Sequence, residues 1–157
     1  MILAALAGGL VGTVVLTTGS RLAQSVGWTR MDIPLLLGTV FTVNRNRASV
    51  IGYAIHFGNG LVFALAYGLV FESVDRAGLL LGAALGAAHG LFAGGALLNV
   101  LLPAVHPRMG TAWTDARDTP ILEPPGFLLV NYGRATMGLT FALHVAYGAI
   151  VGLFASF

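Results

Sequence analysis

The sequence has no cysteine, no lysine and little charge of either sign. Charged residues make up 9% of its 157 positions, against about 25% in an average soluble domain. The missing cysteines exclude disulfides, thiolate nucleophiles and Cys-ligated zinc or iron–sulfur centres. So few charges cannot cover a soluble fold, and the composition therefore indicates an integral membrane protein.

Basic residues are too few to suggest a nucleic-acid partner. Eight arginines face six acidic residues, for a formal net charge of +2, and they are scattered along the chain rather than gathered into a basic footprint. A chain without lysine is typical of a GC-rich genome, so we expect the inner membrane of a bacterium.

Recognisable catalytic motifs are also missing. The sequence has no Gly-rich phosphate loop, no His-Glu-x-x-His, no Gly-x-Ser-x-Gly and no paired carboxylates within its apolar segments. Catalysis is therefore not indicated. The one enzymatic alternative would use polar residues at the membrane interface, namely Asp32, His106, Asp118 and Glu123.

Four apolar stretches are long enough to cross a membrane. Crossing a hydrocarbon core about 30 Å thick takes roughly 18 or more apolar residues. None of the charged side chains falls inside these stretches, which fits a cost of about 2.5 to 3.5 kcal/mol or more for a charge at mid-membrane. The predicted spans cover residues 2–19, 48–71, 77–102 and 135–157.

Two further apolar segments, residues 33–43 and 120–130, are too short to span. Both contain proline, so we expect interfacial or re-entrant pieces. Seven of the eight arginines lie in the two long connections, and Arg76 alone lies in the middle turn. The positive-inside rule then predicts cytoplasmic long connections, with both termini and the middle turn outside.

Landmarks in the first half recur in the second with offsets of 85 to 88 residues, which predicts an internal duplication. The pairs are Trp28 and Trp113, Thr29 and Thr114, Arg30 and Arg117, Asp32 and Asp118, Pro34 and Pro120, Gly8-Gly9 and Gly94-Gly95, Arg47-Ala48 and Arg134-Ala135, His56 and His144, and Gly60 and Gly148.

The predicted fold is all-α: a single membrane domain of residues 1–157, built as a four-helix bundle from two tandem helical-hairpin repeats. The repeats cover about residues 1–72 and 77–157, each with one short interfacial or re-entrant segment. Because each repeat has two spans, both enter the membrane with the same polarity. Their pseudo-twofold axis would run along the membrane normal and set the first span opposite the third at equal depth.

Histidines lie within three of the predicted spans. His56 and His144 are predicted counterparts, and His89 lies near the middle of the third span. Neutral imidazole commonly ligates haem, chlorin-type macrocycles and metal ions, so one hypothesis assigns all three to such a cofactor. Alternatively, each imidazole donates a hydrogen bond to a neighbouring helix. No two histidines have the spacing of a metal motif.

Small residues recur at four-residue intervals, which predicts close helix packing or, alternatively, a surface for another subunit or a cofactor slot. These glycines are Gly8 and Gly12 in the first span and Gly82, Gly86, Gly90 and Gly94 in the third.

The Trp-Thr-Arg segment and its copy are predicted to lie at the membrane face. Trp belongs to the headgroup belt, Arg can hold a lipid phosphate or pair with the nearby Asp, and Pro starts the short apolar element. An alternative is a duplicated anionic-ligand or partner-docking site. The residues are Trp28, Arg30, Asp32, Pro34, Trp113, Arg117, Asp118 and Pro120.

Three functional hypotheses remain open. The leading one is a non-catalytic accessory or scaffold subunit of a larger membrane complex, in contact with lipids and other membrane subunits. It rests on the small extramembrane mass and the glycine-rich helix faces. The second is a His-ligated haem or chlorin carrier. The third is a small transporter or lipid-binding protein. Because the predicted spans contain no charged residue, coupling of such transport to ions is not expected.

Overall fold

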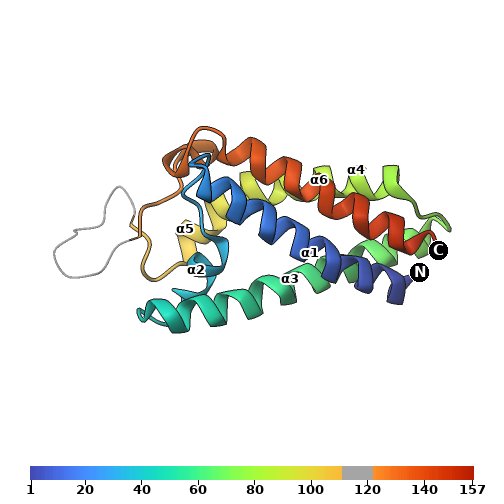
Figure 1. Ribbon diagram of the computed structural model, residues 1–157, viewed down its shortest axis with the longest axis horizontal. Helices are drawn as coiled ribbons and strands as arrows, with labels where there is room; N and C mark the ends of the chain where they lie inside the picture. The colour runs from blue at the N-terminus through green and yellow to red at the C-terminus, as the bar shows by residue number, and fades with distance from the viewer. Residues whose placement is uncertain (111–121) are drawn as a thin grey trace.

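The computed structural model describes residues 1–110 and 122–157, which are helical apart from turns and short connections (Figure 1). The elements are α1 (Ile2–Ser25), α2 (Ile33–Gly38), α3 (Arg45–Ser73), α4 (Leu79–Leu91), the π-helix η1 (Phe92–Leu101), α5 (Leu102–Val105), the 3-10 helix η2 (Phe127–Tyr132) and α6 (Thr136–Ala155).

Four helices are long and apolar enough to cross a membrane, as predicted. They are α1, α3, the continuous helix Leu79–Val105 formed by α4, η1 and α5, and α6. Helices α1 and α3 extend beyond the predicted apolar cores, so that α1 takes in Arg21 and α3 begins at Arg45. At the end of α1 the Arg21 side chain bonds Tyr53 and Asp32, and at the start of α3 the Asn44 side chain accepts from the Arg47 amide; the apolar pattern registers neither.

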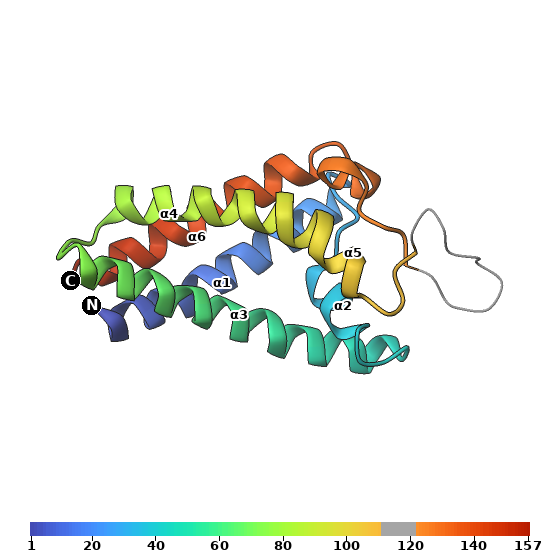
Figure 2. The same cartoon turned by 180° about the vertical axis from the view of Figure 1, so that it is seen from behind.

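Both chain termini and the turn between α3 and α4 lie at one end of the elongated bundle, and α2, α5 and η2 lie at the other (Figures 1 and 2). This arrangement agrees with an even number of crossings. Large apolar side chains cover the outward faces, with Leu3, Val50 and Leu80 each more than 70% exposed. Such a surface suits contact with hydrocarbon.

The long helices pack in the order α3, α1, α6, α4. Helix α1 contacts both α3 and α6, and α6 contacts both α1 and α4, whereas α3 makes almost no backbone contact with α4 or η1. Exact twofold symmetry of the predicted repeats would make the α3–α4 contact resemble the α1–α6 contact. The structure therefore does not confirm the tandem repeat.

The registers of the two hairpins also differ. In the first hairpin Gly60 faces Thr13, whereas in the second Gly148 faces Gly82 and Gly86. The predicted repeat would place Gly148 opposite Asn99, near the other end of that helix. The first and third spans are therefore not matched at equal depth in their hairpins.

Glycines bring the helix backbones into direct contact, as predicted. A Cβ on Gly86 would overlap the carbonyl of His144, and one on Gly148 would overlap the carbonyl of Gly82. A Cβ on Gly8 would crowd Phe154 and Val151 of α6, and one on Gly12 would crowd the ring of Tyr147. Because these small-residue faces are occupied within the molecule, they are not available to another subunit.

The π-helix η1 is not apparent from the sequence pattern. It ends just before Pro103, which has no N–H to donate and whose ring crowds the preceding turn. The side chain of Asn99 in this stretch bonds the segment before α6, donating to the Gly126 carbonyl at 2.7 Å and accepting from the Leu128 amide at 3.0 Å. The helix thus widens where its backbone cannot keep α-helical bonding.

Helix α2 lies flat against the N-terminal half of α3. A Cβ on Gly38 would overlap the Ala48 carbonyl, and a Cβ on Gly52 would overlap the Pro34 carbonyl. Only glycine allows this backbone contact. The short segment predicted at residues 33–43 thus contains the docked helix α2, whereas the described part of the segment predicted at 120–130 leads into η2, where Leu128 and Leu129 have left-handed backbone angles.

We expect Gly52→Ala to separate α2 from α3 and to lower the free energy of unfolding by about 1 to 3 kcal/mol, as overpacking does. Thermal unfolding in detergent measures the effect. The matched control is Gly58→Ala on the same helix, where nothing lies within 4 Å of an added Cβ and no loss is expected. Equal losses in both variants would contradict the close contact.

Candidate functional site

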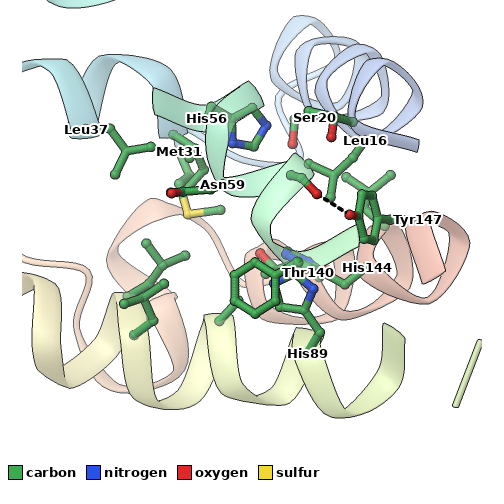
Figure 3. Close-up of a pocket in the computed structure, with 18 residues that line it drawn as sticks. Leu16, Ser20, Met31, Leu37, His56, Asn59, His89, Thr140, His144 and Tyr147 are labelled. Carbon is green, nitrogen blue, oxygen red and sulfur yellow. Dashed lines mark hydrogen bonds between the residues drawn. The ribbon is translucent and has the colours of Figure 1, made fainter. Parts of the chain in front are cut away.

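A cavity of about 90 Å³ lies among α1, α3, α4, η1 and α6, with α2 at one end (Figure 3). Its walls are largely apolar, and none of the described residues that line it is charged. The lining side chains that can hydrogen-bond are Thr13, Ser20, His56, Asn59, His89, Thr140, His144 and Tyr147.

The structure brings the three predicted histidines to this one cavity. The rings of His89 and His144 are in edge contact, with centroids 4.5 Å apart and planes at 73°. His56 comes from α3 and is set apart from that pair in Figure 3. The predicted grouping of these residues is therefore realised in space, although the sequence did not show that His89 and His144 would touch.

Neighbouring side chains fix the ring of His89. Its Nδ1 shares a hydrogen bond of 3.2 Å with the Tyr67 hydroxyl. One face stacks on Phe63, with ring centroids 3.6 Å apart. Tyr147 lies beside the His89 ring and donates its hydroxyl hydrogen to the Gly60 carbonyl. The ring nitrogen Nε2 of His89 is the one that these contacts leave for another partner.

Thr140 and His144 lie one turn apart on α6. His144 donates from Nδ1 to the Thr140 carbonyl at 2.7 Å, so in the neutral ring Nε2 is an acceptor. The Thr140 side chain is only 4% exposed, and its Oγ1 has no hydrogen-bond partner among the described residues. A buried hydroxyl without a partner costs about 1 to 3 kcal/mol, so a hydrogen-bonding group that reached the Thr140 hydroxyl after rotation of this side chain would be stabilised there.

The geometry of His89 and His144 does not fit a macrocycle held between these two imidazoles. Two axial nitrogens, each about 2 Å from a metal, would hold the ring centroids more than about 6 Å apart, whereas His89 and His144 are 4.5 Å apart. The cavity is also smaller than the space of about 150 Å³ that holds a single benzene. Among the described residues, no group of three or more His, Cys, Asp or Glu side chains could hold a metal ion.

Hydrogen bonding by uncharged groups is the chemistry that the cavity offers. It combines neutral acceptors and donors with apolar walls, an arrangement typical of sites that orient a small ligand.

The chain matches no family model, no curated protein and no solved structure.

The Trp28–Pro34 region lies at the end of the bundle that holds α2. Trp28 is 62% exposed, as an interfacial anchor would be. Asp32 caps α2 by accepting from the Leu35 amide at 3.1 Å and pairs with Arg21 at 2.8 Å. Pro34 lies in the first turn of α2.

Arg30 does not pair with the nearby Asp32. Its side chain instead forms an ion pair with Glu123 at 3.0 Å and bonds the Asn131 carbonyl. Burial, together with the charge of Glu123, raises the pKa of the neighbouring Tyr132 to about 12. The predicted second copy, Trp113, Arg117, Asp118 and Pro120, lies outside the described residues.

Residues following α5 hold the other end of α2. The buried His106 bonds the Leu36 carbonyl through Nε2 at 3.1 Å, and Arg108 donates to the Thr39 and Val40 carbonyls at 2.6 and 2.9 Å. Sequence reasoning did not find this contact, because residues 68 to 70 positions apart meet only in the folded chain. Asp32, His106 and Glu123 each have separate partners, namely Arg21, the Leu36 carbonyl and Arg30, and Asp118 lies outside the described residues.

Asp32→Ala should lower the free energy of unfolding by about 1 to 2 kcal/mol, since it removes both the helix cap and the contact with Arg21. Glu123→Gln is the comparison, because its ion pair with Arg30 is largely exposed and such pairs contribute about 0 to 1 kcal/mol. Thermal unfolding at low and high salt measures both. A larger loss in Glu123→Gln would contradict these assignments.

Proposed function

We propose that this protein is a multi-pass membrane protein that binds a small uncharged polar group inside the bilayer, as a carrier or transporter rather than as a catalyst. The four apolar helices support membrane insertion. The unpartnered Thr140 hydroxyl in a cavity lined by three histidines carries the proposal. This function falls within the third hypothesis from the sequence.

The placement of the polar groups supports binding over a purely structural role. His89 shares a hydrogen bond with Tyr67 on another helix, as the packing hypothesis expects, whereas His144 bonds the Thr140 carbonyl of its own helix. Neither bond uses Nε2, and neither involves the Thr140 hydroxyl. His56 makes no hydrogen bond to any described residue. A bundle that used these groups only for packing would leave several of them unsatisfied in hydrocarbon.

Thr140→Val tests the proposal because it removes the hydroxyl with little change in shape. In lipid-stripped protein we expect stability to be unchanged or higher, since an unsatisfied buried group is lost. Adding native membrane extract should then raise the melting temperature of wild type more than that of Thr140→Val.

The control is Thr136→Val on the same helix. Thr136 is fully buried and its hydroxyl bonds that of Thr29 at 2.9 Å, so this change should destabilise the protein with or without extract. If wild type and Thr140→Val respond equally to the extract, the binding function is wrong.

The orientation proposed for the bacterial inner membrane places α2 and the long connections in the cytoplasm. Because the chain has no cysteine, a single introduced cysteine gives an unambiguous label. We expect an impermeant thiol reagent to label Ser25→Cys from the cytoplasmic side and Ser73→Cys from the opposite side; both residues are exposed. The reverse pattern would invert the topology.

The accessory-subunit hypothesis is a second candidate. Gly58 and Gly138 are exposed on the outer surface with open space around them, so a helix of another subunit would find room there. The mass of the particle released by mild detergent tests it. A lone monomer that retains ligand binding would favour the carrier instead.

A further inference from the structure

The tautomer of His144 follows from its hydrogen bond within α6. Its Nδ1 lies 2.7 Å from the Thr140 carbonyl oxygen. A carbonyl oxygen can only accept, so Nδ1 carries the proton of the neutral ring and Nε2 keeps a free lone pair. His144, which lines the cavity, therefore has a hydrogen-bond acceptor at Nε2.

The tautomer of His89 is the opposite one. Its Nδ1 shares a hydrogen bond of 3.2 Å with the Tyr67 hydroxyl, which has no other partner among the described residues. Tyr67 is only 5% exposed, and a buried hydroxyl hydrogen without an acceptor is unfavourable. Tyr67 therefore donates to Nδ1, and the proton of the neutral His89 ring lies on Nε2.

Both imidazoles are neutral in these surroundings. None of the described residues that line the cavity is charged, so no carboxylate among them balances an imidazolium. A charged group within a membrane span is costly. Each ring therefore carries a single proton, and the two tautomers differ.

Packing holds the two rings next to each other. Their centroids are 4.5 Å apart and their planes meet at 73° (Figure 3). Phe63 stacks on one face of His89, and the Tyr147 ring meets His89 at 82°. An N–H donor on His89 and an acceptor on His144 are thus neighbours in one cavity, and neither has a partner among the described residues.

The volume of the cavity limits the size of a ligand. It measures about 90 Å³, whereas a space of about 150 Å³ holds one benzene molecule. In proportion to the six carbons of benzene, a ligand here has about four heavy atoms or fewer. Water, small alcohols and acetamide lie within this limit, and an aromatic ring does not.

We infer that His89 and His144 bind, as a pair of opposite tautomers, a small neutral molecule that both accepts and donates a hydrogen bond. The oxygen of an alcohol or primary amide accepts from His89 Nε2, and its O–H or N–H donates to His144 Nε2. A ketone or ether of the same size bonds His89 alone. The inference rests on the proposed binding function and adds the class of ligand and the residue, Tyr67, that makes His89 the donor.

Nitrogen NMR of the full chain in lipid bilayers, with isotope-labelled histidine, tests the tautomers, because protonated and bare ring nitrogens resonate far apart. We expect the proton of His89 on Nε2 and that of His144 on Nδ1. Tyr67→Phe should let the His89 proton occupy either nitrogen and should leave His144 unchanged. A proton on Nδ1 of His89 in wild type would overturn the inference.

The matched control is Tyr147→Phe. Tyr147 also contacts the His89 ring, but its hydroxyl bonds the Gly60 carbonyl rather than a ring nitrogen. His89 should therefore keep its tautomer in this variant. An equal change in the two tyrosine variants would contradict the role of Tyr67.

Acetamide is the ligand probe, and acetone, which has the same number of heavy atoms but no donor, is the comparison. Acetamide should shift the Nε2 resonances of both His89 and His144. Acetone should shift that of His89 alone and bind about fivefold more weakly, as expected for one lost hydrogen bond. Water is distinguished by its cross-peaks to the ring nitrogens, which acetamide should displace.

Equal binding of the two probes, or no shift with acetamide, would overturn the inference. Water cross-peaks at both Nε2 atoms that acetamide does not displace would show that the pair holds water alone, and would overturn it too. If the membrane extract still stabilises wild type more than Thr140→Val, the ligand class is then wrong and the binding function stands. If the extract fails as well, the two proposals fall together.

Discussion

The close approach of α4 to α6 is the contact on which the rest of the arrangement depends. Gly82 and Gly86 lie directly against the backbone of α6 near Gly148 and His144, at a distance that any Cβ would prevent. This contact fixes the height of α4 in the bundle and brings His89 to the edge of the His144 ring. Since little hydrophobic force acts between helices in lipid, close packing of this kind supplies much of their association.

The packing order of the long helices also separates α3 from the widened η1. Helix α1 lies between α3 and α6, so α3 reaches the third helix only through side chains such as Phe63, which stacks on His89. Toward α2 even these contacts end and the cavity begins. The π-helical turns before Pro103 and the docked α2 then shape its wall and its floor.

Polar interactions are divided between the two ends of this space. At the α2 end, polar side chains form an ion pair, a helix cap and bonds to backbone carbonyls, and Arg21, Asp32, His106 and Arg108 all have defined partners. Within the bundle, the polar groups are uncharged and only partly satisfied. This contrast is what the cost of charge in hydrocarbon predicts for helices that span a membrane.

The sequence by itself determined the number and approximate limits of the apolar helices, because crossing a membrane depends on local hydropathy and length. It also indicated that helices would pack closely at glycines, and it singled out the three histidines as candidate site residues. Only the tertiary structure decided which helices touch, that His89 meets His144, that Asp32 pairs with Arg21 rather than Arg30, and that α2 is held by His106. These contacts join residues far apart in the chain. They depend on the register between packed helices, which local sequence patterns do not encode. The same registers leave the predicted repeat unconfirmed.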